Sequence, residues 1–323
     1  MSITTLIGIG VFIISLAGLV KGSDMFSDFA ERLAYHFKIP PFIIGVTIVS
    51  IGTSLPELFS AISANLHGAT EIALGDIIGS NITNIFLVLG VATLFMKTTK
   101  LKVTHELIHV DLPFFVGSVF MIVLALWDNK FSQIEGLIAI CGALLYILYT
   151  ISVRKDMKNA RILEEINIEH KTKKFSFLDI PKGGVGLLLL LIGAKYFIES
   201  IIITSAGFSI STELIAITLV PLGSNLPELS VTIRNAIRGK SEIVVGNILG
   251  SNIFNLFGVL GIAGLLGTLT ASPDFFQLAI PTLIASTLLY FFITQEKEIT
   301  RWEGGLLLLS YVMYINLAFN FLS

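Results

Sequence analysis

Two carboxylates lie deep inside apolar stretches of this chain, and each follows directly after a proline. Glu57 ends the sequence GTSLPE at residues 52–57, and Glu228 ends the sequence GSNLPE at residues 223–228. A charged group in hydrocarbon is costly, so its default interpretation is part of an ion or substrate path. A proline removes a backbone donor and breaks or kinks the helix that carries it. The freed carbonyl groups are tolerated at membrane depth only where protein or a water-filled cavity surrounds them.

Helical spacing gathers further oxygen ligands on the same faces as the two carboxylates. Residues four apart share a helix face, and each carboxylate has a hydroxyl four residues earlier. The next apolar segment of each half carries a serine and an asparagine at the same spacing. The four pairs are Thr53 with Glu57, Ser224 with Glu228, Ser80 with Asn84, and Ser251 with Asn255.

If antiparallel neighbouring helices bring these faces together, the result is an all-oxygen site with two carboxylates. Such a donor set suits hard cations such as Ca²⁺, Na⁺ or Mg²⁺. The sequence shows no Cys/His cluster that would indicate a softer metal. A site charge of −2 is neutralised by one Ca²⁺, by two Na⁺ or by two protons. A site that either of two cargoes can neutralise fits the logic of an antiporter.

Other polar and small residues near these motifs leave two interpretations open. Asp76 lies one turn before Ser80, whereas the corresponding residue of the second motif is Asn247. Asp76 is therefore either a charge at the entrance or a third carboxylate of the site, and Asn247 is likewise a possible ligand. Asn81 and Asn252 lie off the Ser80 face and are expected to bridge helices. Small residues allow helices to pack closely, and this is the role expected for Gly75, Gly79, Gly246 and Gly250.

The composition indicates that membrane-spanning helices position these polar side chains. The chain has 323 residues, of which 54% are hydrophobic and 14% charged, whereas soluble domains carry about 25% charged residues. A helix needs about 20 apolar residues to cross a bilayer. We therefore expect an all-α polytopic membrane protein with ten spans. These lie near residues 3–20, 41–66, 72–95, 110–127, 135–153, 182–202, 212–236, 242–267, 275–294 and 304–322.

The basic residues agree with ten spans. Of the 21 Lys and Arg residues, all but Lys130 and Lys195 fall on one side of the predicted membrane. The positive-inside rule makes this side cytoplasmic, which puts both termini outside. We expect a cell (inner) membrane location.

Residues 46–92 and 217–263 align without a gap at an offset of 171, with 23 of 47 positions identical. The offset equals five spans, an odd number, so the two copies must cross the membrane in opposite directions. This pattern predicts two inverted five-helix repeats, an architecture common in secondary transporters with a midplane site. The expected divisions are a first repeat at 1–153, a cytoplasmic linker at 154–181 and a second repeat at 182–323.

The two motifs, in their order and spacing, closely resemble the alpha-repeats of the sodium/calcium exchanger family within the cation/calcium antiporter superfamily. The resemblance extends over the whole chain and is typical of prokaryotic members. It implies that spans 2, 3, 7 and 8 surround the ions while spans 1 and 6 slide across them. It also implies that Glu57 and Glu228 bind Ca²⁺ directly and share Na⁺. The implied ligands are Thr53, Ser54, Glu57, Ser80 and Asn84, with Ser224, Asn225, Glu228, Ser251 and Asn255.

The sequence thus predicts an antiporter that exports Ca²⁺ against inward Na⁺ by alternating access. Proton/cation exchange at the same carboxylates is an alternative, and a passive cation channel is another that the repeat disfavours. We expect no enzyme activity, because no set of nucleophile and base or metal-protease motif is present. The expected partners are Ca²⁺, Na⁺ and the lipid bilayer, with H⁺ as a partner in the proton-exchange alternative. We expect no cofactor, nucleic acid or obligate protein partner.

Overall fold

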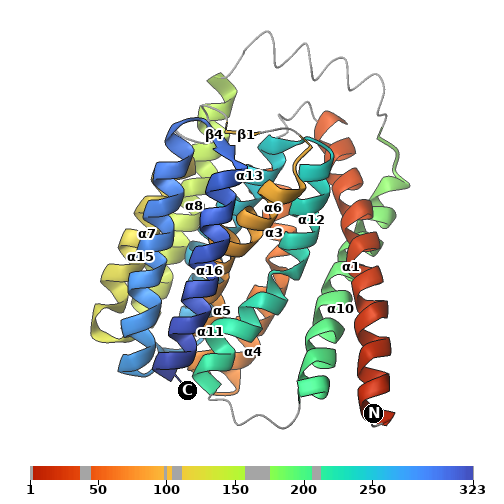
Figure 1. Ribbon diagram of the computed structural model, residues 1–323. Helices are drawn as coiled ribbons and strands as arrows, with labels where there is room; N and C mark the ends of the chain where they lie inside the picture. Colours follow the sequence, from red (N-terminus) through yellow and green to blue (C-terminus); the bar gives the residue numbers. More distant parts are fainter. Residues whose placement is uncertain are drawn as a thin grey trace.

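A computed structural model describes residues 3–36, 45–97, 100–103, 111–156, 175–205 and 212–322. The described chain is mainly helical (Figure 1), with short strands only at the ends of the bundle. The longer helices are α1 (Ile3–His36), α4 (Leu55–Leu66), α5 (Thr70–Thr83), α7 (Leu112–Ala125), α8 (Gln133–Asp156), α10 (Asp179–Ser205), α11 (Thr212–Ser224), α12 (Leu226–Ile237), α13 (Ser241–Ile253), α15 (Pro273–Gln295) and α16 (Arg301–Leu322).

Two helical segments are broken at corresponding residues, as the prolines predict. The first consists of η1 (Gly45–Val49), a π-helix, followed by α3 (Ser50–Thr53) and α4, and the break lies at Ser54. The axis bends there by 44°. The second breaks at Asn225, between α11 and α12. Each proline is the second residue of the helix after the break, where its missing N–H disrupts no intrahelical hydrogen bond.

Two long helical rods, residues Thr70–Phe95 and Ser241–Leu266, form the buried centre of the bundle. Each contains a π-helical turn, η2 (Asn84–Leu89) in the first and η5 (Phe254–Val259) in the second, and each ends in a short α-helix, α6 (Gly90–Phe95) and α14 (Leu260–Leu266). The rods run antiparallel. The hydroxyl of Thr70, at the start of the first, donates to the carbonyl of Thr270, beyond the end of the second, at 2.8 Å. At the opposite end, the amide of Lys97 donates to the carbonyl of Ala236 at 3.2 Å.

Glycines allow each rod to cross the broken segment of the other half at very short range. A Cβ atom at Gly79 would lie 2.5 Å from Pro221 Cγ of α11 and 3.0 Å from the carbonyl oxygen of Ile217. A Cβ atom at Gly250 would lie 2.5 Å from the carbonyl oxygen of Val46 and 2.6 Å from Ser50 Oγ. These two crossings use positions related by the same offset of 171. They confirm the packing role predicted for Gly79 and Gly250.

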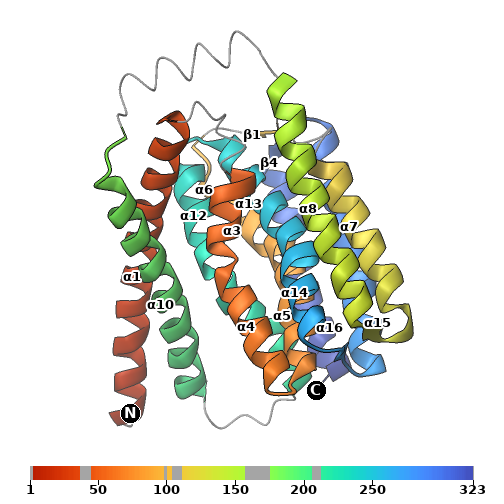
Figure 2. The ribbon, with the colours of Figure 1, turned by 180° about the vertical axis from the view of Figure 1, so that it is seen from behind.

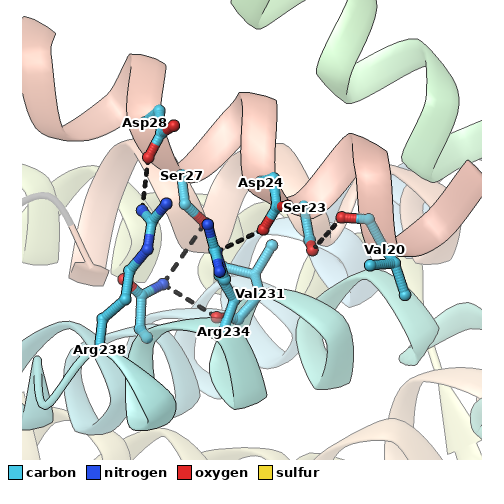
Figure 3. A network of polar contacts seen from close by, with 9 residues as sticks. Val20, Ser23, Asp24, Ser27, Asp28, Val231, Arg234 and Arg238 are labelled. Carbon is cyan, nitrogen blue, oxygen red and sulfur yellow. Dashed lines mark hydrogen bonds and ion pairs between the residues drawn. The ribbon is translucent and has the colours of Figure 1, made fainter.

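Helices α1 and α10 form a separate pair beside the bundle, seen in both views (Figures 1 and 2). Gly22 of α1 faces the backbone of Gly186 and Leu190, and Gly193 of α10 faces Leu19, again at matched positions. Helix α1 extends beyond the predicted first span at 3–20 and continues to His36. Beyond Lys21, Asp24 and Asp28 of α1 form ion pairs with arginines of α12 (Figure 3).

The outer helices expose apolar side chains. Ile134 and Leu148 of α8, Phe292 of α15 and Leu309 of α16 are each more than 60% exposed. Among the described residues, five helices are long and apolar enough to cross a membrane, or six if the bent pair around Ser54 counts as one span. Apolar faces of this extent mark contact with lipid. The chain is a multi-pass membrane protein.

Two small antiparallel sheets connect loops at the ends of the bundle. Strand β1 (Lys100–Lys102) pairs with β4 (Glu298–Thr300), and β2 (Lys130–Phe131) pairs with β3 (Leu269–Thr270). The short 3₁₀ turn η4 (Leu126–Asp128) precedes β2. Helix α8 runs to Asp156 and α10 begins at Asp179, so the ends of both helices lie within the predicted linker at 154–181. Most of that linker, residues 157–174, lies outside the described residues, as do 41–44, 110 and 206–211.

Candidate cation site

The two carboxylates that follow the prolines are fully buried at the centre of the bundle. Glu57 and Glu228 each have 0% of their surface exposed. Each lies in the first turn of the helix after its break, at the third residue of α4 and of α12. The glycine crossings bring both breaks against the central rods, so residues from four segments meet here.

Glu228 is held by hydroxyl groups from both halves of the chain. Ser54, at the first break, donates to Glu228 Oε1 at 2.9 Å. Ser251, on rod α13, donates to the same oxygen at 3.5 Å. The structure therefore brings together Ser54, Glu228 and Ser251, which are three of the predicted ligands.

Glu57 differs from its counterpart, because neither of its carboxylate oxygens has a hydrogen-bond partner among the described residues. The charges that act on it are those of Glu228 and Asp76. A buried carboxylate without partners is strongly unfavourable, and two like-charged neighbours add to the cost. A cation bound between the carboxylates would offset this energetic cost.

Asp76 is fully buried and contacts serines of both halves of the chain. The hydroxyl of Ser224 donates to Asp76 Oδ1 at 2.7 Å, and Ser80 donates to the same oxygen at 3.4 Å. The hydroxyls of Ser80 and Ser224 are 3.2 Å apart. Asn247, the residue corresponding to Asp76, instead donates to the hydroxyl of Thr232 at 3.1 Å.

Asparagines on the two rods meet next to the carboxylates. Asn84 Nδ2 donates to Asn252 Oδ1 at 3.0 Å, which confirms that Asn252 bridges helices. Asn81 does not do so in this way, since its amide donates to Ile77 of its own helix at 2.8 Å. Asn84 and Asn255 both lie in π-helical turns, which residue spacing did not reveal. Such turns frequently occur at functional sites.

The remaining two predicted ligands are buried at the breaks and bond to their own helices. Thr53 donates to the carbonyl of Val49 at 3.1 Å. Asn225 Nδ2 donates to the carbonyl of Pro221 at 2.8 Å, and more weakly to that of Ser80 at 3.4 Å. The amide oxygen of Asn225 accepts no hydrogen bond from the described residues.

Several buried oxygens of the predicted ligands have no hydrogen-bond partner among the described residues. No three His, Cys, Asp or Glu side chains in the described ranges are grouped closely enough to hold a metal by themselves. A cation here would combine carboxylates with neutral amide and hydroxyl oxygens, which is the chemistry of Ca²⁺ and Na⁺ sites. Among the predicted and possible ligands, described oxygens without a hydrogen-bond partner belong to Glu57, Asp76, Asn84, Asn225, Glu228, Asn247 and Asn255.

Comparison with known proteins identifies one protein family that this chain matches. The family model described as sodium/calcium exchanger protein matches residues 7–153 and 184–320. The chain is 36% identical over 312 residues to an uncharacterised membrane protein of Methanocaldococcus jannaschii, covering 96% of this chain and 97% of that one. It is 30% identical over 344 residues to the sodium/calcium exchanger MaX1 of Methanosarcina acetivorans, covering 96% and 97%.

Solved structures of the same family also match this chain. The structure of the sodium-calcium exchanger NCX_Mj soaked with Na⁺ and Ca²⁺ matches with a TM-score of 0.80 and 30% sequence identity. The match covers 98% of this chain and 99% of the other. The likeness therefore extends over the fold as a whole and includes both halves.

Proposed function

Because this chain belongs to the sodium/calcium exchanger family, we propose that it exchanges Ca²⁺ for Na⁺ across the cell (inner) membrane, by alternating access around one central site. Its relatives are exchangers, and the chain is a transporter and not an enzyme. The direction we propose is Ca²⁺ export coupled to inward Na⁺. The ligands we propose are those predicted from the motifs, with Asp76 added and without Asn247.

One observation supports this function above the others: Glu57 and Glu228 are buried together with few protein partners. Glu228 Oε2 and both oxygens of Glu57 accept no hydrogen bond from the described residues. The charges of these two glutamates are balanced by one Ca²⁺, by two Na⁺ or by two protons. Each of these cargoes lowers the electrostatic cost of moving the site, whereas an empty site retains it, and membership of the sodium/calcium exchanger family favours Na⁺ over H⁺. This difference favours obligatory exchange over leak through a channel.

Alternating access needs two equivalent halves, and several features support ten helices in two inverted repeats. The family model matches one stretch in each half. The central rods run antiparallel, and the glycine crossings are paired at the same offset. The two chain termini lie at the same end of the bundle (Figure 1), as an even number of spans requires. We propose that this end faces outward, because the basic loops lie at the other.

The test is Ca²⁺ flux in liposomes containing the purified protein, with an imposed Na⁺ gradient and clamped pH. We expect Na⁺-driven Ca²⁺ movement, which Glu57→Gln and Glu228→Gln each abolish. Glu296→Gln changes an exposed carboxylate after α15 and serves as the control with normal flux. Near-normal flux in both site variants would contradict the site. Flux that follows a pH gradient but not Na⁺ would establish proton exchange, and flux without any counter-ion would establish a channel.

A further inference from the structure

Pro221 interrupts the hydrogen bonding of α11 one turn before the second break. Proline has no N–H, so the carbonyl oxygen of the residue four positions earlier, Ile217, loses its usual helical donor. Pro221 lies inside α11, and Ile217 is 0% exposed. A carbonyl group that is buried at membrane depth without a donor is costly. A donor from another helix would remove this cost.

The structure supplies that donor from Tyr314 of α16, 97 residues further along the chain. Its hydroxyl donates to the carbonyl oxygen of Ile217 at 2.6 Å, a normal length for a hydrogen bond between two oxygens. Tyr314 is 1% exposed, so the bond is shielded from solvent. The hydroxyl of Tyr314 thus takes the place of the N–H that Pro221 lacks.

The corresponding carbonyl group in the first half is held by a different donor. At the offset of 171, Ser50 corresponds to Pro221 and Val46 corresponds to Ile217. Serine keeps its N–H, and the hydroxyl of Ser50 donates to the carbonyl oxygen of Val46 at 2.7 Å. Neighbouring helices and hydroxyl side chains are two general means of satisfying the backbone at a helix break in a membrane. The chain uses a neighbouring helix in the second half and a hydroxyl of the same segment in the first.

Helix α16 is itself packed closely on the first central rod. A Cβ atom added at Gly304 of α16 would overlap Thr93 of α6, so the two backbones approach closely there. The ring of Tyr314 also packs against that of Tyr311, with ring centroids 6.1 Å apart. The hydroxyl is therefore presented to α11 from a helix that is docked on the first rod.

The turn that begins at Pro221 carries two of the proposed ligands, Ser224 and Asn225. The backbone N–H and the side-chain amide of Asn225 both donate to the carbonyl oxygen of Pro221, at 3.1 and 2.8 Å. Ser224 donates to Asp76 of the first rod at 2.7 Å. A change in the course of α11 at Ile217 would therefore move this turn and both side chains with it.

We propose that Tyr314 is a positioning residue of the candidate cation site. Its hydroxyl holds the proline kink of α11 so that Ser224 and Asn225 face the first rod. Tyr314 acts through these two residues and is not itself a ligand. This inference deepens the proposed exchange and rests on it, because it takes Ser224 and Asn225 as ligands.

The test is a double-mutant cycle that removes one donor and restores another. Tyr314→Phe deletes the hydroxyl, and Pro221→Ser returns an N–H and a hydroxyl to the α11 backbone. Serine occupies the corresponding position in the first half, where Ser50 lies against the crossing glycine Gly250. The wild-type protein, both single variants and the double variant are purified in detergent. The rise of the melting temperature with Ca²⁺ concentration, and separately with Na⁺ concentration, gives the apparent affinity of each folded protein.

We expect Tyr314→Phe to lower the apparent Ca²⁺ affinity by about tenfold, the low end of the range for groups that orient metal ligands. In the Pro221→Ser background we expect the same substitution to leave the affinity unchanged, because the Ile217 carbonyl then has a donor within its own helix. A hydroxyl that only stabilises the fold would have the same effect on affinity in both backgrounds.

Two control variants separate positioning from stability. Tyr290→Phe removes the same atom from another fully buried tyrosine, whose hydroxyl has no hydrogen-bond partner among the described residues. Ile122→Val removes a methylene from the buried core of α7, which lowers the melting temperature. We expect both variants to bind Ca²⁺ with wild-type affinity.

Wild-type affinity in Tyr314→Phe would overturn the positioning role, and so would an equal loss in both backgrounds. If Tyr314→Phe alone does not fold, a double variant that folds and binds Ca²⁺ as Pro221→Ser does supports the role, whereas a double variant that also fails to fold overturns it. If Pro221→Ser does not fold, the affinity of Tyr314→Phe against the two control variants decides.

Flux in liposomes separates this inference from the proposed function. If the wild-type protein shows no Na⁺-driven Ca²⁺ flux, the proposed function fails, while the binding cycle still tests Tyr314. If the wild-type protein shows that flux and the cycle shows no coupling, only the positioning role fails. If neither ion raises the melting temperature of the wild-type protein, there is no cation site to position and both proposals fail.

Discussion

The hydroxyl of Ser54 donates a 2.9 Å hydrogen bond to the carboxylate of Glu228, 174 residues further along the chain. Ser54 is the residue at which the first segment breaks, and Glu228 follows the second break. This bond joins the two halves at the candidate cation site. It also occupies one oxygen of Glu228, whereas the other oxygen has no hydrogen-bond partner among the described residues.

Ser54→Ala is therefore expected to weaken cation binding without removing any charge. Loss of a group that orients a metal ligand typically costs about 10–100-fold in affinity. We expect the apparent Ca²⁺ affinity to fall by roughly tenfold, with the maximal rate less affected. Ca²⁺-dependent flux in liposomes measures both. An unchanged affinity would mean that the bond does not position Glu228.

Glu57→Gln is expected to stabilise the protein in the absence of ions while abolishing exchange. The substitution removes a buried charge that has no hydrogen-bond partner among the described residues and lies near two others. Each kcal/mol gained corresponds to about 2–4 °C in melting temperature for a domain of 150–250 residues. Thermal unfolding in detergent, with and without Ca²⁺, checks this. A lower melting temperature without ions would contradict it.

Gly79→Ala is expected to destabilise the fold, because the added Cβ would overlap Pro221 of the other half. Overpacking of this kind typically costs about 1–3 kcal/mol. Gly117→Ala on α7 is the matched control, since a Cβ atom added at Gly117 would have no other atom within 4 Å. Melting temperatures of the two variants give the comparison. Equal stability of both would show that the crossing can relax.

The hydrogen bond between Asn84 and Asn252 is expected to couple the two rods weakly. Double-mutant cycles in a membrane protein give about 0.6 kcal/mol on average for such bonds, with a maximum near 1.7. We expect a coupling in this range for Asn84→Ala and Asn252→Ala. The four unfolding free energies of the cycle measure it. Strict additivity would show that these amides act independently, as ligands alone.

The sequence predicted the class of the fold, and it predicted many of the side chains that meet at the candidate site, because bilayer physics leaves few options. Apolar stretches of spanning length must be helical, so composition alone indicated a membrane bundle. A proline next to a buried carboxylate, repeated in two copies, identified both breaks and the residues around them. The glycines likewise predicted close helix packing, which the structure shows at Gly79 and Gly250.

Only the tertiary structure decided which partners these residues have. No sequence pattern distinguishes Glu228, which accepts two hydroxyl hydrogen bonds, from Glu57, whose oxygens have none among the described residues. Nor could spacing along one helix place Asp76 against Ser224, because that contact joins segments 148 residues apart. Local spacing fixes which side chains share a helix face, whereas the facing partner depends on how distant helices cross. That crossing depends on packing over the whole bundle.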